Sequence, residues 1–279
     1  MIYSIENNNI RVYDKTQFNP KHILECGQVF RYGINDDGNY FVYSNKYKAT
    51  ILEKPEYYEI ISNNTDYFVN YFDLKTDYNL IKNKLKTNKV LSPMIDYGYG
   101  IRILNADTEE MIYSFILSQN NNIKRIQKIV EKMCEIGENM GDYKAFPTSK
   151  NLSKLPFEFY KNLGAGYRDK FLKSTADFLS LQNLEDVKKL STDEILSYLL
   201  KINGIGPKVA SCVLLFGFGR KEKFPVDTWL EQVYYNHFSK EKRTRDEMQK
   251  YFENEFGEYS GVAQQYLFYY ERNNSTNNK

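Results

Sequence analysis

Lys208 is the residue whose position most favours covalent chemistry. It follows the run Gly204-Ile205-Gly206-Pro207, which separates two segments with helical apolar spacing, and proline is typical of the first helical turn. The positive end of the helix dipole and any burial both favour a neutral amine over an ammonium there. A neutral amine can attack an electrophilic carbon and form a Schiff base. An ordinary solvated lysine is the simpler alternative.

Gly204 and Gly206 predict a turn that binds an anion. Glycine allows a tight turn with little steric cost, and the first N–H groups of the following helix, including that of Val209, have no partner within the helix. Together with the helix dipole, these groups suit a backbone phosphate. A plain corner between two helices explains the Gly-x-Gly pattern equally well when the pattern is taken alone.

Asp227 is the second candidate, in the run Phe-Pro-Val-Asp-Thr-Trp at 224–229 that ends a loop and begins a helix. Its carboxylate suits an N-cap, and Thr228 with Glu231 suggests a capping box. An aspartate that only caps is the alternative. A helix–Gly-x-Gly–helix segment with a lysine, followed by Pro-Val-Asp, is more specific than either piece, so we expect Asp227 to act beside Lys208.

The first part of the chain is predicted to be β-rich. Short aromatic and β-branched runs end at turn residues, and Asp37-Gly38 indicates a hairpin between strands at 28–34 and 39–43. The further elements expected in this part are strands at 48–52 and 57–61 and a helical patch at about 66–89.

From Asp107 onward the pattern becomes helical. Asp107 with Glu110 and Ser191 with Glu194 predict capped helix starts, and apolar residues recur at helical spacing over 123–133. We therefore expect an α+β fold, with an N-terminal antiparallel β-sheet domain and then a mainly α-helical domain that carries a helix-hairpin-helix motif. The expected parts are a β-rich domain at 1–105, the helical domain at 106–272 and a frayed polar tail at 273–279.

Composition and charge limit the class of protein. The 279 residues are 42% hydrophobic with a formal net charge of +2, which is less basic than many nucleic-acid-binding domains. Backbone N–H groups can, however, bind phosphates without adding charge. Cys26, Cys134 and Cys212 have no disulfide, metal or iron–sulfur spacing. Because no apolar run reaches ~18 residues and no signal peptide is evident, we expect a cytoplasmic chain without a membrane span, metal or cofactor.

These segments, in this order, resemble the 8-oxoguanine glycosylase branch of the helix-hairpin-helix DNA glycosylase superfamily. The likeness extends from Cys26 to Phe268 and includes further motifs. They are Gly-Gln-Val-Phe-Arg-Tyr at 27–32, Asn-Asn-Asn-Ile-Lys-Arg at 120–125, Leu-Gly-Ala-Gly-Tyr-Arg at 163–168 and Gly-Val-Ala-Gln-Gln-Tyr-Leu-Phe at 261–268. In that family a histidine often stands two residues after the aspartate and contacts a phosphate, whereas this chain has Trp229.

The resemblance implies a bifunctional DNA glycosylase and AP lyase that acts, as a monomer, on duplex DNA containing 8-oxoguanine. Lys208 would form a Schiff base with C1′ of the nucleotide, and β-elimination would follow. Asp227 would assist departure of the base and stabilise the oxocarbenium charge. Gly204, Gly206 and Val209 would bind DNA phosphate. The resemblance implies neither a metal nor another cofactor.

A flipped, oxidised guanine is the base that the resemblance implies. The carbonyl of Gly27 would accept its N7–H, Gln264 would pair with its Watson–Crick edge, and Phe268 would stack on its ring. Cys212 would form part of the opposite wall. A surface amide at Gln264 and ordinary core packing at Phe268 and Cys212 are the alternatives.

The resemblance also implies which residues meet the partner strand. Asn120 and Tyr167 match residues that fill the vacated stack, and Arg125 and Arg168 match donors to the orphaned cytosine. Such donors imply a preference for cytosine opposite the lesion. A polar asparagine-rich loop and solvated arginines are the alternatives.

Other functions stay open at this point. An alkylpurine DNA glycosylase of the same superfamily usually lacks a lysine equivalent to Lys208. A non-catalytic helix-hairpin-helix module would bind DNA without forming an adduct that borohydride can trap. A purely structural helical protein would not require the ordered set of motifs.

Overall fold

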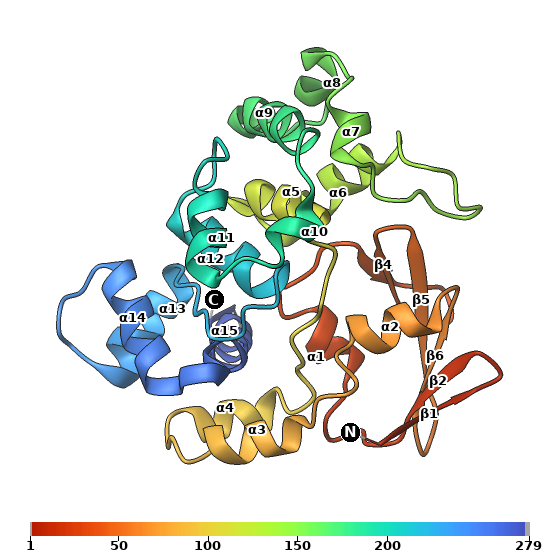
Figure 1. The fold of residues 1–279 in the computed structure, drawn as a ribbon. Helices are drawn as coiled ribbons and strands as arrows, with labels where there is room; N and C mark the ends of the chain where they lie inside the picture. The colour runs from red at the N-terminus through yellow and green to blue at the C-terminus, as the bar shows by residue number, and fades with distance from the viewer. Residues whose placement is uncertain (1, 277–279) are drawn as a thin grey trace.

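The computed structural model describes residues 2–276 and consists of an antiparallel sheet followed by a mainly helical part (Figure 1). The sheet has six strands in the order β1-β2-β6-β5-β4-β3, and each neighbouring pair is antiparallel. The strands are β1 (Tyr3–Glu6), β2 (Asn9–Val12), β3 (Tyr32–Ile34), β4 (Tyr40–Ser44), β5 (Tyr47–Glu53) and β6 (Tyr58–Ser62). The predicted fold class is therefore confirmed.

Four short helices accompany the sheet, and helices of varied length build the second part (Figure 1). The first group is α1 (Pro20–Leu24), α2 (Thr65–Tyr71), α3 (Tyr78–Leu85) and α4 (Leu91–Tyr97). The second group is α5 (Thr108–Ser118), α6 (Ile123–Cys134), α7 (Ser149–Leu152), α8 (Phe157–Asn162), α9 (Asp169–Leu179), α10 (Leu184–Val187), α11 (Thr192–Leu199), α12 (Pro207–Phe216), α13 (Thr228–Val233), α14 (Arg245–Phe256) and α15 (Ser260–Thr276). One apolar cluster of buried residues runs through both parts.

Two β-hairpins follow from turn chemistry. The hairpin predicted at Asp37-Gly38 joins β3 to β4, and Gly38 has the positive φ, 80°, that the turn requires. Strands β1 and β2 are short and half polar, and they are not among the strands expected from the sequence. The signal lies in their turn, because Asn7 and Asn8 both adopt positive φ (49° and 64°), which asparagine tolerates better than most residues.

The predicted helix starts are mostly confirmed. Ser191 and Glu194 form a capping box at α11. The box predicted at Asp107 is only half formed: Asp107 accepts from the N–H of Glu110 at 2.9 Å. The Glu110 carboxylate turns instead to the sheet and accepts from the backbone N–H of Asn45 at 3.1 Å. The contact of Glu110 with Asn45, which is distant in sequence, thus replaces the expected contact with the backbone of Asp107.

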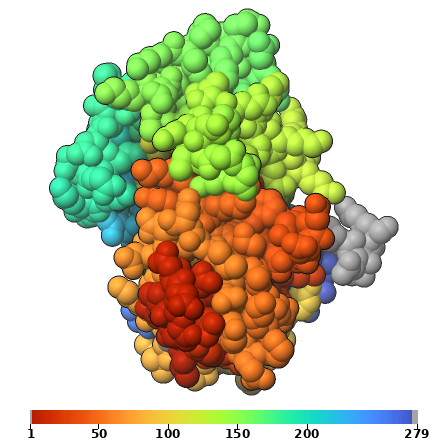
Figure 2. All heavy atoms as spheres, turned by 90° about the vertical axis from the view of Figure 1, so that its right-hand side faces the viewer, coloured from red at the N-terminus to blue at the C-terminus, as the bar shows by residue number. Residues whose placement is uncertain are grey.

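The sheet and the helical part touch along the loop between α6 and α7. In Figure 2 this loop, in yellow-green, lies directly on the orange strands. Tyr143 stacks on Tyr43 with 4.7 Å between ring centroids. Arg31 is fully buried at the same junction, where its Nε donates to Glu131 at 2.9 Å and its Nη2 to the carbonyl of Lys144 at 2.7 Å. These contacts fix the segment that follows Gly27 against the helical part.

Helix α15 lies near the centre of the molecule and packs against both parts (Figure 1). It reaches Thr276, so the residues at 273–276 extend this helix, although they were expected to belong to a frayed tail. The last three residues of that expected tail, 277–279, lie outside the described residues. Among the described helices, none is long and apolar enough to cross a membrane.

Candidate active site

The hairpin between α11 and α12 is built around Gly204. Its φ is 90°, and a Cβ atom added there would lie 2.4 Å from the ring of Phe171, so only glycine fits. Its carbonyl accepts from Nε2 of Gln119 at 2.9 Å. A Cβ atom added to Gly206 would have no atom outside its chain neighbours within 4 Å. Gly206 is the N-cap of α12, so the unpaired N–H groups of the first turn, including that of Val209, follow it directly.

Asp227 is the N-cap of α13, as predicted. Its Oδ1 accepts from the N–H groups of Trp229 and Leu230, each at 3.0 Å. The second capping box, predicted for Thr228 and Glu231, is wrong: α13 already begins at Thr228, and Glu231 pairs with Arg245 at 2.9 Å. One carboxylate oxygen of Asp227 therefore caps the start of the helix.

Lys208 lies in the first turn of α12, with its Nζ 6.0 Å from the centre of the Phe115 ring. Burial disfavours its charge, but the Cys212 sulfur, which accepts a hydrogen bond from Nζ, and the Asp227 carboxylate outweigh burial. The pKa of Lys208 is consequently raised above its ordinary value. The neighbouring Cys212 and Asp227 thus shift this pKa in the direction opposite to the one expected from burial and the helix dipole.

Two cavities, each of about 570 Å³, meet at Lys208 and Asp227, which line both. The apolar cavity has three phenylalanine rings in its wall, those of Phe30, Phe115 and Phe268. The polar cavity reaches the hairpin and the loop after α5, and its lining includes Gln119, Asn120, Gly206, Val209 and Arg245. An amine and a carboxylate thus lie between a pocket suited to a flat ring and a groove suited to an anion.

Gly27 and Phe268 form one wall of the apolar cavity. The φ of Gly27 is 85°, and a Cβ there would lie 3.1 Å from the Phe268 ring, so a side chain would push the two apart. On the α15 side, the guanidinium of Arg272 lies 5.3 Å from the centre of the Phe268 ring and donates to the carbonyl of Glu25. The loop and the helix are held together directly at this wall.

Gln28 anchors the loop that carries Gly27. It is fully buried, its Nε2 donates to the carbonyl of Arg102 at 2.8 Å, and its Oε1 accepts from the N–H of Leu104 at 2.9 Å. A buried amide with both ends bonded keeps the backbone in one position. The motif at 27–32 therefore both lines the apolar cavity and fixes the loop that carries Gly27.

Gln264 and Cys212 are buried and do not line either cavity. Nε2 of Gln264 donates to the carbonyl of Pro225 at 3.3 Å, and its Oε1 accepts from Gln265 at 2.7 Å. Gln264 thus supports the segment that leads to Asp227. Burial raises the pKa of Cys212, and the neighbouring Lys208 opposes this shift.

The residues expected to contact the partner DNA strand differ in their exposure to solvent. Asn120 is exposed with φ 44° and lines the polar cavity, and Tyr167 is 52% exposed. Arg125 is exposed and donates to the carbonyl of Gly164 at 3.0 Å. Arg168 is only 3% exposed.

The guanidinium of Arg168 is occupied by backbone carbonyls. It donates to Ala165 at 2.9 Å, to Asn120 at 3.0 Å and to Gln119. In the DNA-free protein Arg168 therefore holds the loop that carries Asn120. A bond from Arg168 to a DNA base requires it to exchange one of these carbonyls, whereas Arg125 already reaches solvent.

Several residues that line the cavities carry no sequence signal of a site. Phe115 lies in α5, which is buried along nearly its whole length, so nothing in the sequence distinguishes a cavity wall from core. Phe30 lies in the motif at 27–32, so the motif is the signal that could have identified it, although its spacing alone does not. Arg245 and Arg272 carry no local pattern at all, because they enter the site only through the packing of α14 and α15.

Comparison with protein families gives the class. The 8-oxoguanine DNA glycosylase N-terminal domain family matches residues 11–112. The HhH-GPD superfamily of base excision DNA repair proteins matches residues 113–258, more than half of the chain. The fold and the site thus define a base excision DNA repair protein of the HhH-GPD superfamily.

Individual relatives narrow the class. The structure of MBOgg1 in complex with a low affinity DNA ligand has a TM-score of 0.92 and 36% identity, covering 99% of this chain and 100% of that one. The 8-oxoguanine glycosylase/lyase of Clostridium acetobutylicum, bound to double-stranded DNA with cytosine opposite 8-oxoguanine, has a TM-score of 0.91 and 34% identity, with 99% of both chains covered. This chain therefore belongs to the 8-oxoguanine glycosylase branch of the superfamily, as the motifs predicted.

Curated relatives are more distant or longer. N-glycosylase/DNA lyase OGG1 of Arabidopsis thaliana is 31% identical over 187 residues, which are 61% of this chain and 51% of that protein. The chain thus spans about half the length of this plant relative. N-glycosylase/DNA lyase of Saccharomyces cerevisiae is 29% identical over 266 residues, covering 79% of this chain and 68% of that protein.

Proposed function

We propose that this chain is a bifunctional DNA glycosylase and AP lyase that flips 8-oxoguanine out of duplex DNA and excises it. The observation that carries the proposal is the position of Lys208 and Asp227, which line both the apolar and the polar cavity. The activities named for the structural and curated relatives agree with it. Double-stranded DNA that contains the lesion is the proposed partner.

The flipped base enters the apolar cavity. There Phe268 stacks on the ring, and the carbonyl of Gly27 accepts the N7–H that distinguishes 8-oxoguanine from guanine. Gln264 reaches the Watson–Crick edge only if it gives up its bond to Pro225. The fixed Gly27 loop is therefore the main source of selectivity for the oxidised base.

Lys208 supplies the nucleophile. After its ammonium loses a proton, the Nζ lone pair attacks C1′ while the N-glycosidic bond breaks, and the bond electrons leave with the base, which takes up a proton. The sugar ring opens to a Schiff base, loss of a 2′ proton follows, and the 3′ phosphate departs by β-elimination. Asp227 stabilises the positive charge that develops on the sugar. The lysine proton leaves through the polar cavity, which Lys208 lines, so Asp227 keeps its negative charge.

The polar cavity takes the DNA backbone and the gap in the stack. The backbone N–H groups of Gly204, Gly206 and Val209 bind a phosphate. Asn120 and Tyr167 fill the space that the base vacates. Arg125 offers donors to the orphaned base, and cytosine, with acceptors at O2 and N3, matches them best.

Borohydride trapping on defined duplexes tests the proposal. The protein should form a covalent adduct with 8-oxoguanine duplexes, fastest with cytosine opposite, and not with undamaged guanine. Adenine, guanine and thymine opposite the lesion should each slow the reaction, since a good base contact discriminates by about 1–3 kcal/mol. Binding without an adduct would instead favour a non-catalytic hairpin module. Excision of alkylated purines without an adduct would favour the alkylpurine glycosylase.

Phe268→Ala should slow excision of 8-oxoguanine and leave the affinity for undamaged duplex nearly unchanged. Removing the ring takes away stacking worth about 1–3 kcal/mol, and Phe268 lines only the apolar cavity of the two. Single-turnover rates and duplex binding measured side by side separate the effects. Phe268→Leu is the control that keeps the cavity filled. If Phe268→Ala excises at the wild-type rate, the base is held elsewhere.

A further inference from the structure

Arg245 lies where a DNA backbone would pass, although no motif marks it. We propose that Arg245 binds a DNA phosphate in the polar cavity and that Glu231 holds its guanidinium in place until DNA arrives. The inference rests on the proposed function for its ligand, a phosphodiester of duplex DNA. It adds a side-chain contact to the backbone N–H groups of the hairpin.

The position of Arg245 is set by the start of α14. Thr244 caps this helix in a complete capping box with Glu247, which fixes the first residue, Arg245. From there the side chain lines the polar cavity opposite the first turn of α12. Its positive charge is close enough to act on Lys208, whose pKa it lowers against the larger opposite effects of Cys212 and Asp227.

The charges around the polar cavity favour an anion. Lys208 and Arg245 are the cationic residues of its described lining, against the single carboxylate of Asp227. That carboxylate already caps α13. Trp229, where the family often has a phosphate-binding histidine, brings an indole N–H but no charge. Arg245 supplies a cation to the same cavity from another helix.

Glu231 is a partner that a phosphate can replace. Nε and Nη2 of Arg245 donate to the same oxygen, Oε2 of Glu231, at 3.0 and 2.9 Å. The side chains are 48% and 35% exposed, so water screens their attraction. A phosphate at the hairpin offers two oxygens in the geometry that guanidinium prefers, and the dipole of α12 favours it further. Exchange of Glu231 for phosphate therefore needs only a rotation of the arginine side chain.

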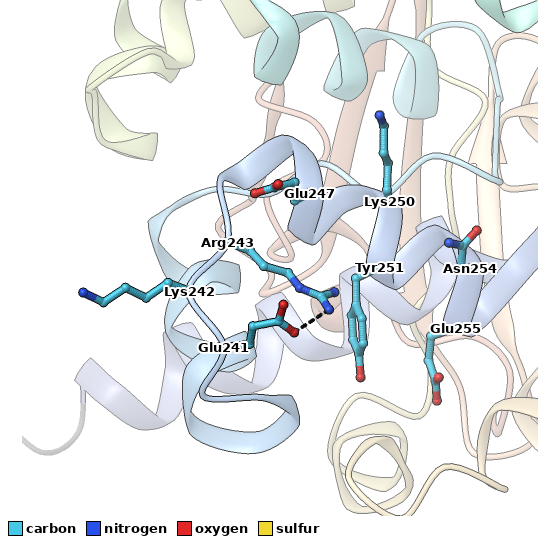
Figure 3. Close-up of a pocket in the computed structure, with 8 residues that line it drawn as sticks. All are labelled: Glu241, Lys242, Arg243, Glu247, Lys250, Tyr251, Asn254 and Glu255. Atoms are coloured by element: carbon cyan, nitrogen blue, oxygen red, sulfur yellow. Dashed lines mark hydrogen bonds and ion pairs between the residues drawn. The ribbon is translucent and has the colours of Figure 1, made fainter.

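Arg243 provides a matched control. It is two residues away and carries the same charge, but it pairs with Glu241 at 2.7 Å and lies 5.0 Å from the centre of the Tyr251 ring. Figure 3 shows it turned into a separate polar cavity of about 520 Å³ along α14. This cavity is not lined by Lys208 or Asp227.

The test compares Arg245→Ala with Arg243→Ala in duplex binding over a range of salt. Arg245→Ala should weaken binding equally on lesion-bearing and undamaged duplex and reduce the slope of log K against log salt by about 1. The wild-type advantage over this variant should therefore shrink about threefold to fourfold between about 50 and about 200 mM salt. Arg243→Ala should leave both the slope and the excision rate unchanged. Arg245→Lys should restore the slope.

Equal effects of the two alanine variants would overturn the phosphate contact, since they would show only the loss of general charge. Glu231→Gln alone should tighten DNA binding. Added to Arg245→Ala, it should have no further effect on binding. A gain that persists in that background would overturn the holding role of Glu231. A wild-type protein that binds no DNA would refute the proposed function itself, whereas steep salt dependence untouched by Arg245→Ala would refute this inference alone.

Discussion

Lys208→Gln should abolish the borohydride-trapped adduct and the nicking of 8-oxoguanine duplexes, while duplex binding stays close to that of the wild type. An amide nitrogen cannot form the Schiff base, but glutamine keeps most of the volume beside Phe115 and Cys212. The backbone N–H groups that we assign to phosphate binding are also unchanged. Trapping, strand cleavage and duplex affinity measured on the same preparation give the result.

Lys201→Gln is the matched control for this change. Lys201 is exposed and stands just before the same hairpin, so the variant also loses one positive charge near DNA. It should trap and nick as the wild type does. Undiminished trapping by Lys208→Gln would move the nucleophile to another residue.

Asp227→Asn should slow base excision by about a hundredfold or more, because a negative charge near the developing oxocarbenium ion is lost. The fold should persist, since asparagine caps helices about as well as aspartate and can still accept from the N–H groups of Trp229 and Leu230. Single-turnover excision of 8-oxoguanine measures the effect. Strand cleavage at a preformed abasic site then separates base release from the lyase step.

Asp227→Ser is the companion variant, with a capping oxygen but no carboxylate group. It should be as slow as Asp227→Asn. A folded variant of either kind that excises at the wild-type rate would leave Asp227 as a cap and nothing more.

Local signals explain why the hairpin could be predicted from sequence. Gly204 is required by its own positive φ, Pro207 by the first helical turn, and Asp227 by the N–H groups two and three residues on. Each of these constraints acts over a few residues, so a linear sequence displays it. The strands at β4, β5 and β6 follow from equally local alternation and turns.

Contacts between distant segments explain what could not be predicted. Arg168 finds its acceptors in the loop at 119–120, and Gln264 finds its acceptor at Pro225. The charge state of Lys208 depends on Asp227 as well as on Cys212 one turn away. In each case the residue type was noticed, but its partner is fixed only by packing. The roles assigned to these residues at the DNA therefore stay predictions.

The contact between Gly27 and Phe268 has a consequence for the order in which the protein is made. Domains fold from the N-terminal side as the chain leaves the ribosome, so the Gly27 loop, the hairpin and Lys208 all emerge before α15. A nascent chain at that stage lacks the ring of Phe268 and, with it, one wall of the apolar cavity. The apolar cavity is therefore complete only once α15 has been made and has packed against the Gly27 loop.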